Sequence, residues 1–506
     1  MNLLLYKLPG SIMGIKIKKV DLLSDIRVQP DKDKANDVAV NGSDINFVQS
    51  DEAVPDEDVS EKADDKAALQ ALSTSDRNPA VTIPDATLQP PIPQGVKREQ
   101  SATSQSKTEE SDADIPPKPK VESKAENDFV SNNSTDIEDF TTGQTGLRRF
   151  FAALNNVDNL GRPVRIAFLG DSFIEGDILV ADFRSKMQKH FGGRGVGFIP
   201  IQSETAQYRP TIKQSADGWK IYSMIKDKSR KYVLSGMLFE PSANTASINF
   251  QTVDMYPESK EVSSLKFIYS SSLMTDITLK NGNESSTYKL PATDQVTQYE
   301  IKGRFTNGKL QFKNTRGLQA IGIALEDNHG VVVDNFSLRG NSGLIMSNLD
   351  VKSCRDLQKV RPYDLIVLQY GLNVASDSMR DYGWYRNKMT TVVEHIQKCF
   401  PGADILMLGV SDRSHKDGAT YSTMPAVLSL LRAQRQTAKN AEVAFWSIFA
   451  AMGGHNSMVK FVNSNLASKD YTHLNFRGGR QIADALYDSL INEKGMYDSD
   501  EKLVER

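Results

Sequence analysis

Five strand-length runs dominated by apolar residues constrain the fold of this chain more than any other feature. The first is VRIAFLG at residues 164–170, and VVVDNFSL, DLIVLQY, DILMLGV and VAFWS follow after residue 330. A run without polar alternation is typical of a strand that is covered on both faces, as in a parallel sheet. Each run precedes a stretch with helical spacing, such as residues 178–191 after the first. This alternation predicts an α/β fold, a doubly wound domain of three layers around a parallel five-stranded sheet.

The pattern changes period between residues 201 and 328. Stretches such as ASINFQTV, SLKFIYSS and KLQFKN are β-rich, and Gly, Asn, Asp and Ser separate them. The segments NGNESS and TNGKL contain Asn-Gly pairs, which suit the type I′ turn of a hairpin. A segment of this length and pattern predicts a β-sandwich, which interrupts the α/β domain after its first strand–helix unit. The two ends of such an insert must lie close together.

The first 140 residues differ sharply in composition from the rest of the chain. They hold 16 basic and 27 acidic residues, whereas the remaining residues carry a net charge of +8. They also contain only four of the 40 aromatic residues. A segment so acidic and so poor in large apolar groups cannot bury enough surface to offset its ordering entropy. We therefore expect residues 28–140 to form a disordered acidic linker, preceded by a short segment at 1–27 of unknown role.

Several classes of protein are disfavoured at this point. No run of about 18 apolar residues is present to form a transmembrane helix, and the longest apolar run of the N-terminal segment, residues 3–6, is too short for a secretory signal. That segment could still tether the chain to a membrane. Two cysteines, Cys354 and Cys399, allow one bridge or two free thiols, but no disulfide framework or Cys-based zinc site. The mild positive charge of the body forms no Lys/Arg-rich block, so nucleic-acid binding has little support.

Two segments, one after the first predicted strand and one before the last predicted helix, carry the side chains of a nucleophilic site. Ser172 follows the first strand directly, in a Gly-Asp-Ser turn. Its own N–H would face the site beside a helix N-terminus, where it can stabilise an anion. A serine there is also a common helix cap. Asp470 and His473 lie three residues apart before the last helix. A serine nucleophile needs a base, and the base needs a carboxylate to orient it, so one loop would supply both.

Two further strand ends carry groups that can stabilise an oxyanion. Gly340 follows the strand VVVDNFSL, where a bare backbone N–H can approach a ligand closely. Asn373 follows DLIVLQY and places a side-chain amide at a third strand end. Each residue alone is common in turns. Together with Ser172 and the Asp470/His473 pair, they supply in chain order the groups that acyl transfer needs.

This series of motifs resembles the SGNH (GDSL-type) hydrolase family, whose blocks carry Ser, Gly, Asn and Asp-x-x-His. The segment LASKDYTHLNFRGGRQIADAL is similar to the last block of that family, whereas Val374 stands where the third block often has Asp. We assign residues 141–200 and 329–494 to the two parts of the hydrolase domain, 201–328 to the insert and 495–506 to a C-terminal tail. With FGGRGVGFIPI leading into it, the insert looks like the jelly-roll-like, carbohydrate-binding-module domain of bacterial peptidoglycan O-acetylesterases.

The resemblance implies removal of O-acetyl groups from a cell-wall glycan, with Ser172 as nucleophile, His473 as base and Asp470 as its orienting acid. The N–H groups of Ser172 and Gly340, with the Asn373 side chain, would hold the oxyanion. It implies no metal and no organic cofactor, and a periplasmic or cell-envelope location in a bacterium. Two alternatives stay open: an O-acetyltransferase that uses the same triad, and a non-catalytic glycan-binding protein of the envelope. The oligomeric state is unknown.

Other side chains are weaker candidates for binding or chemistry. Arg194, in GGRGVG, could contact an anionic substrate, and Trp219, in the opening segment of the insert, could stack on a sugar ring. Burial in a core is the commoner fate of a tryptophan. Glu175 and Asp177 have the residue types of a glycosidase acid pair. Their place at the start of a helix favours interaction with the helix dipole instead.

Overall fold

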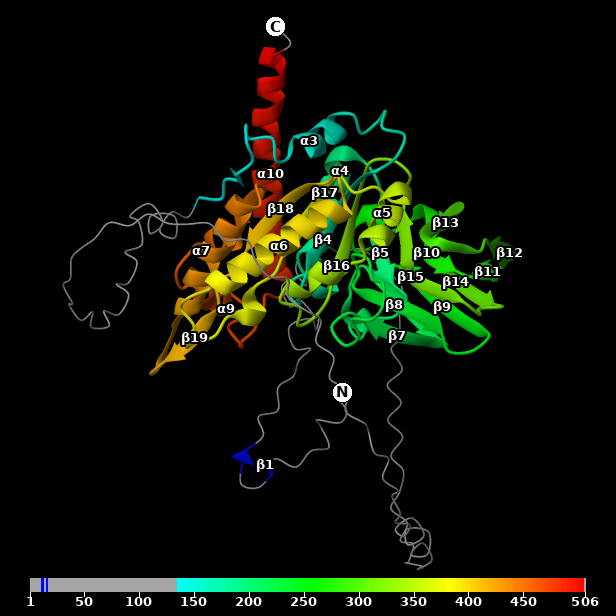
Figure 1. The fold of residues 1–506 in the computed structure, drawn as a ribbon, viewed down its shortest axis with the longest axis horizontal. Coiled ribbons are helices and arrows are strands. Elements are labelled where there is room, and N and C mark those ends of the chain that lie inside the picture. The colour runs from blue at the N-terminus through cyan, green and yellow to red at the C-terminus, as the bar shows by residue number, and fades with distance from the viewer. Residues whose placement is uncertain (1–10, 13–14, 17–133, 505–506) are drawn as a thin grey trace, which may run out of the picture. The chain divides into compact units, whose positions relative to one another are not determined.

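The computed structural model describes residues 11–12, 15–16 and 134–504 (Figure 1). The predicted N-terminal segment and acidic linker lie outside the described residues, apart from β1 (Ser11–Ile12), β2 (Ile15–Lys16) and the residues from 134 to 140. Among the helices of the described part, none combines the length and the apolar character that crossing a membrane requires.

The central sheet has the strand order β16-β4-β17-β18-β21-β3 (Figure 1). The first five strands are parallel, and β3 pairs with β21 in the antiparallel direction. All residues of β4, β17, β18 and β21 are buried, which explains their continuous apolar sequences. The strands are β3 (Glu138–Asp139), β4 (Val164–Gly170), β16 (Val331–Ser337), β17 (Leu365–Gln369), β18 (Asp404–Gly409) and β21 (Ala444–Ser447).

Helices cover both faces of this sheet and form two separate apolar cores. Ile166 and Phe168 of β4 belong to the core that contains side chains of α3, α4 and α10, whereas Ala167 and Leu169 belong to the core formed with α5, α6 and α7. Alternate side chains of one strand thus serve opposite faces, and the domain has three layers. The helices are α3 (Arg148–Asn155), α4 (Val180–Phe191), α5 (Val351–Val360), α6 (Gly383–Cys399), α7 (Pro425–Asn440), α8 (Ile448–Ala451), α9 (Ser457–Asn463) and α10 (Phe476–Val504).

Both ends of the α/β domain extend further than the sequence pattern predicted. The linker was expected to extend to residue 140, but Glu138 pairs with Phe445 of β21, and Thr135 O accepts a bond from the buried Trp446 indole. Backbone hydrogen bonds hold this edge, so its acidic composition gave no signal. The C-terminal tail was expected from residue 495, but α10 continues to Val504. Within this last part of the helix, the ring centroid of Tyr497 lies 5.8 Å from that of Phe151.

The insert consists of two antiparallel sheets packed around a third apolar core. Its first strand, β5, lies before the expected boundary at residue 201 and pairs with β15. Phe198 of β5 also packs against Phe336 of β16, with 4.6 Å between ring centroids. One sheet holds β5 (Gly197–Pro200), β7 (Trp219–Ser223), β8 (Met237–Pro241), β10 (Val262–Ser271), β13 (Thr293–Phe305) and β15 (Leu318–Glu326), and the other β6 (Ile212–Asp217), β9 (Thr245–Thr252), β11 (Thr275–Asn281), β12 (Glu284–Leu290) and β14 (Asn307–Lys313).

The two Asn-Gly segments of the insert have different fates. Asn281 and Glu284 face each other across a tight hairpin between β11 and β12, with Gly282 at φ +59°. The second prediction was wrong, because Asn307 and Gly308 lie within β14, which does not pair with β13. A Cβ at Gly308 would come within 2.6 Å of the Phe250 ring, so glycine serves close packing there rather than a turn.

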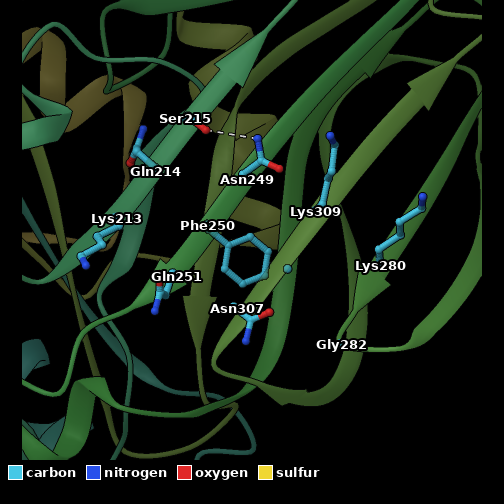
Figure 2. A pocket seen from close by; sticks show the side chains of 11 residues that line it. Lys213, Gln214, Ser215, Asn249, Phe250, Gln251, Lys280, Gly282, Asn307 and Lys309 are labelled. Carbon is cyan, nitrogen blue, oxygen red and sulfur yellow. Dashed lines mark hydrogen bonds between the residues drawn. The ribbon is translucent and has the colours of Figure 1, made fainter. Parts of the chain in front are cut away.

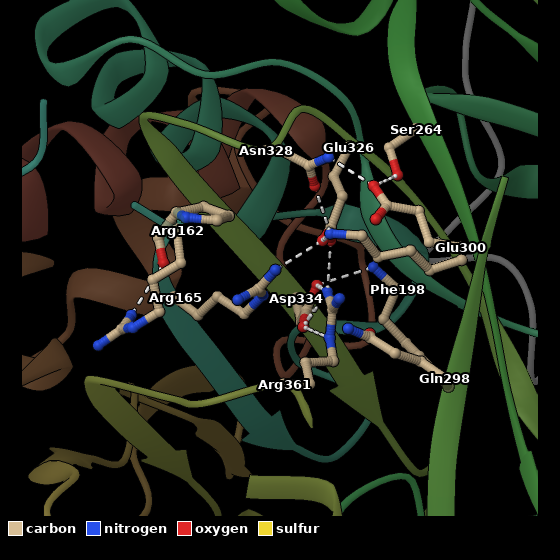
Figure 3. Close-up of polar contacts among 12 residues, drawn as sticks. Arg162, Arg165, Phe198, Ser264, Gln298, Glu300, Glu326, Asn328, Asp334 and Arg361 are labelled. Atoms are coloured by element: carbon tan, nitrogen blue, oxygen red, sulfur yellow. Dashed lines mark hydrogen bonds and ion pairs between the residues drawn. The ribbon is translucent and has the colours of Figure 1, made fainter. Parts of the chain in front are cut away.

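A buried network of charges joins the insert to the central sheet (Figure 3). Glu326 of β15 accepts bonds of 2.7 Å each from Arg165 of β4, Lys266 of β10 and Arg361, which follows α5. Arg361 also pairs with Asp334 of β16 at 2.7 Å. Burial alone would raise the pKa of Glu326, but the three cations hold it well below the usual range. The network therefore stays ionised and ties four strands and a helix end together.

Candidate active site

Ser172 lies at the carboxyl edge of the central sheet, two residues after β4 ends. Its side chain is largely buried, and its Oγ lies 3.1 Å from Nε2 of His473. The adjoining turn is fixed by Asp171, whose Oδ1 accepts a bond of 2.9 Å from the N–H of Phe173. The serine oxygen therefore points at an imidazole that comes from a segment some 300 residues further along the chain.

Asp470 holds this imidazole from the other side. Its Oδ2 lies 2.7 Å from His473 Nδ1, and its Oδ1 accepts bonds from the N–H groups of Thr472 and His473. Burial would raise the pKa of Asp470, but the hydrogen bond and charge of His473 lower it below its usual value. An ionised Asp470 favours a proton on Nδ1 and leaves Nε2 free to accept the hydroxyl proton of Ser172. The structure thus brings together three residues that the sequence predicted as a unit.

Asn373 and Gly340 are the predicted oxyanion donors, and Asn373 is hydrogen-bonded to the residue before Ser172. Asn373 Nδ2 donates to Asp171 Oδ2 at 2.8 Å and to the carbonyl of Asn341 at 3.1 Å. Both amide hydrogens thus have acceptors here, and donation to an oxyanion would replace one of these bonds. Gly340 has φ +75°, and a Cβ there would meet nothing within 4 Å. Its role therefore depends on its backbone conformation rather than on crowding.

Asp171 is a buried carboxylate that the sequence interpretation did not single out. Burial raises its pKa to about 6, although the Phe173 N–H, the charge of His473 and the Asn373 amide each act in the opposite direction. It is the acceptor that links the Ser172 turn to the Asn373 turn. The GDS motif itself was the available signal, since an acid directly before the nucleophile must lie within this edge.

A short hairpin after β18 was also missed. It consists of β19 (Ser414–Asp417) and β20 (Thr420–Thr423), and the N–H of Ser414 donates to Tyr471 O at 3.0 Å. The ring of Tyr421 stacks on that of Tyr471, with 3.8 Å between centroids and 6° between planes. Tyr471 has φ +57°, a strained conformation for a bulky residue, in the middle of the Asp470–His473 loop. The Asp-Gly pair in HKDGATY was the hairpin signal that could have found it.

Glu175 and Asp177 do not lie in the first turn of α4, where the dipole interpretation placed them. The carboxylate of Asp177 is fully buried and binds Arg184 at 3.0 Å, Arg209 at 2.9 Å and the amide of Asn335 at 2.9 Å. Burial opposes ionisation, but the two arginines lower the pKa of Asp177 well below its usual value. It braces the segment after Ser172, and Glu175 pairs with Arg339 next to Gly340.

Arg194 and Trp219 are not brought to Ser172. The carbonyl of Arg194 accepts a bond from Asp327 in the segment that leads into the amino end of β16. A seven-residue strand separates that edge of the sheet from the carboxyl edge by about 20 Å. Trp219 donates its indole N–H to Ser247 O at 3.1 Å and packs edge-on against Phe312 in the insert. A side chain closer to the site is Arg413, whose Nη1 lies 3.5 Å from Leu372 O, beside Asn373.

Within residues 134–504 and the short N-terminal strands, no three His, Cys, Asp or Glu side chains gather as a metal site would require. Cys354 and Cys399 are both buried and free. Burial raises the pKa of Cys354 well above its usual value, so this thiol stays protonated at neutral pH.

Comparison with solved structures identifies the fold. A peptidoglycan O-acetylesterase structure matches with a TM-score of 0.59 and 21% identity, covering 71% of this chain and 99% of that one. A family two carbohydrate esterase from Cellvibrio japonicus matches with a TM-score of 0.24 and 11% identity, over 56% of this chain and 98% of that one. No protein-family model and no curated protein matches the chain. The predicted resemblance to peptidoglycan O-acetylesterases is confirmed at the level of the fold by the first structure.

Proposed function

We propose that this chain is a serine esterase that removes O-acetyl groups from a polysaccharide. The observation that carries the proposal is the hydrogen-bonded series Ser172 Oγ, His473 Nε2, His473 Nδ1 and Asp470 Oδ2, with separations of 3.1 and 2.7 Å. A hydroxyl, an imidazole and an ionised carboxylate in this order are the parts of an acyl-transfer triad. The fold shared with a peptidoglycan O-acetylesterase supports acetyl esters as the substrate class.

The geometry supports a two-step reaction. Ser172 Oγ attacks the acetyl carbonyl carbon while its proton passes to His473 Nε2, and Asp470 stabilises the resulting imidazolium. The backbone N–H groups of Ser172 and Gly340 and the Asn373 amide are the proposed donors to the oxyanion. Collapse of the tetrahedral intermediate transfers the His473 proton to the departing sugar oxygen and leaves an acetyl-enzyme. Water, deprotonated by His473, then releases acetate and restores Ser172.

Two further parts of the proposal concern the identity of the glycan and the compartment in which the protein acts. We propose peptidoglycan as the glycan and the bacterial cell envelope, or periplasm, as the compartment. Arg413 beside the Asn373 turn offers a cation near the site for a carboxylate on the glycan. A membrane tether through the N-terminal segment would keep the domain near that polymer. The triad works without a metal or an organic cofactor.

The test is release of acetate from a chromogenic acetyl ester and from O-acetylated peptidoglycan. We expect Ser172→Ala to lower kcat by about 10⁴-fold or more with unchanged thermal unfolding, because a methyl group cannot act as nucleophile. Ser464→Ala, at an exposed position after α9, is the matched control and should keep full activity. A Ser172→Ala variant with full activity, or a wild-type Ser172 that does not react with a fluorophosphonate, would refute the proposal. Added glycan acceptor would reveal acetyl transfer as acetylated product.

A further inference from the structure

One face of the insert carries a hollow of about 600 Å³ that is separate from the Ser172 site (Figure 2). It lies on the sheet β12-β11-β14-β9-β6, whereas the other sheet of the insert is the one that pairs with β5 and packs towards the central sheet. Three lysines and several amides line it: Lys213, Asn249, Gln251, Lys280, Asn307 and Lys309. No function considered so far uses these side chains.

The strand register arranges these side chains in two rows. Asn249 faces Lys309 on β14, and Lys309 in turn faces Lys280 on β11. In the second row, Gln251 lies between Lys213 on β6 and Asn307 on β14. Neighbouring strands are about 4.8 Å apart, so Lys213 and Lys280, three strands from one another, are separated by about 14 Å. The hollow is therefore longer than a single sugar ring or a single anion.

The three lysines meet no acidic side chain among the residues that line the hollow. No Asp or Glu lines the hollow, and among the described contacts none of Lys213, Lys280 and Lys309 makes a hydrogen bond or ion pair. Lys266 in the same insert differs, because it is buried against Glu326 and Asn328. Like charges directly opposite each other, as Lys280 and Lys309 are, destabilise a sheet. A local arrangement that costs stability without a structural partner points to a ligand of opposite charge.

We propose that this groove, which we call the lysine groove, binds a carboxylate-bearing polysaccharide chain. The three lysines would meet carboxylates, while Asn249, Gln251 and Asn307 present amide donors and acceptors that suit sugar hydroxyls. Nucleic acid fits less well, because single strands are held by stacking on exposed aromatic rings, and the one ring here, Phe250, is 3% exposed. The groove would hold the polymer while the triad acts elsewhere on it.

The first test measures binding to polygalacturonate, a carboxylated glycan, at low and at physiological salt. The variant is Lys213→Gln, Lys280→Gln and Lys309→Gln combined, in a Ser172→Ala background so that hydrolysis plays no part. We expect affinity to fall about tenfold or more at low salt, and the salt dependence to weaken, because three charges are lost. The matched control removes the same charge from exposed lysines off the groove, Lys220, Lys226 and Lys302. Equal loss in both triple variants, or no loss in the first, would overturn the proposal.

The second test separates recognition of sugar from attraction of charge. Asn249→Ala combined with Asn307→Ala should weaken binding of polygalacturonate severalfold and leave binding of polyglutamate, which lacks sugar hydroxyls, unchanged. Equal effects on both polymers, or tighter wild-type binding of single-stranded DNA than of polygalacturonate, would overturn the glycan assignment. With the triad intact, the lysine variant should hydrolyse a small acetyl ester at the wild-type rate. Loss of binding and loss of esterase activity are therefore scored independently.

Discussion

Two regions of the molecule hold linked charged groups. One is the junction between the insert and the central sheet, and the other is the carboxyl edge of that sheet. They differ in how exposed their side chains are. At the junction, the side chains of Glu326 and Arg361 are completely buried. At the edge, His473 is 27% and Asp470 42% exposed. The junction carboxylate Glu326 is bound by three cations at once, whereas His473 has one carboxylate on one nitrogen and a hydroxyl on the other. Buried groups joined by several ion pairs hold structure. A hydroxyl, an imidazole and a carboxylate in series, open to substrate, can move a proton.

Titration separates the two regions as well. The cations around Glu326 lower its pKa well below the usual range, and Asp334 and Glu326 raise that of Arg361 despite burial, so neither group changes charge near neutral pH. At the edge, burial raises the pKa of Asp171 to about 6. Functional sites commonly hold such displaced values. The comparison therefore predicts that mutations at the edge change rate and mutations at the junction change stability.

Asp470→Asn should give the largest effect on rate. The amide can keep the shape of the loop but favours the wrong tautomer of His473, so we expect kcat to fall about 10⁴-fold. The free energy of unfolding should change little, because the side chain is partly exposed. Steady-state kinetics on a chromogenic acetyl ester and urea unfolding measure the two quantities. Asp488→Asn, at an exposed position on α10, is the control. Full activity in Asp470→Asn would contradict a catalytic role for the residues at this edge.

Arg361→Met should give the largest effect on stability. Removing the cation leaves Glu326 and Asp334 buried with fewer partners, so the free energy of unfolding should fall by about 3–5 kcal/mol. The folded fraction should keep the wild-type kcat, because Arg361 contacts none of the edge residues. Arg355→Met, on the exposed side of α5, should change stability by less than about 0.5 kcal/mol. A large loss of kcat with intact stability would erase the distinction between junction and edge.

Much of the central sheet could be predicted because burial on both faces leaves continuous apolar sequences, as in β4 and β18. The edge strand β3 could not be predicted, since it has two acidic residues and is held through its backbone. The Asn-Gly pair at Asn307 misled the interpretation, because glycine is used both in turns and where a Cβ would not fit. At Gly308 the lack of a Cβ makes room for the Phe250 ring. Composition reports what is buried, but not which partner covers it.

The sequence predicted which residue types form the candidate site, but the acid–histidine spacing alone did not show which pair belongs to it. An acid three residues before a histidine occurs at Glu326/His329, at Asp412/His415 and at Asp470/His473. Glu326 belongs to the junction network, and His415 pairs with Asp377 rather than with Asp412. In the structure, the pair that lies next to Ser172 is the third one. The spacing alone does not distinguish the three pairs. The order of the motifs, with Asp470 and His473 before the last helix, pointed to this pair from the sequence.

The pH dependence of stability tests whether burial of ionised Asp171 destabilises the folded state. Its pKa rises from an ordinary 3.8 to about 6 in the folded chain, so between these values the folded state binds more protons than the unfolded state. Asp171 should therefore lower the free energy of unfolding by about 3 kcal/mol as pH rises through this window. Asp171→Asn should remove this contribution and make the pH profile less steep. Urea unfolding between pH 4 and 8 measures it.

The control for this prediction is a second buried carboxylate away from the edge. Burial raises the pKa of Asp404 to about 7, and its Oδ2 accepts a bond from the N–H of Phe150 in α3. Asp404→Asn should also flatten the profile, over a window that extends to about pH 7, but leave kcat unchanged. Asp171→Asn should lower kcat as well, since Asp171 holds Asn373. An unchanged slope in both variants would contradict the assigned protonation.

The smallest expected effect concerns Tyr421. Its ring covers Tyr471, whose left-handed backbone lies between Asp470 and His473, so the stack helps to hold that loop. A stacked aromatic pair contributes about 0.5–1.5 kcal/mol, and Tyr421→Ala should lower kcat by about two- to tenfold with KM for a small ester unchanged. Tyr421→Phe keeps the ring and should restore the rate, and Tyr288→Ala in the insert should have no effect. If Tyr421→Ala lowered only the stability and left kcat unchanged, the hairpin would have a structural role, like the junction. The residues that affect the rate would then not include Tyr421.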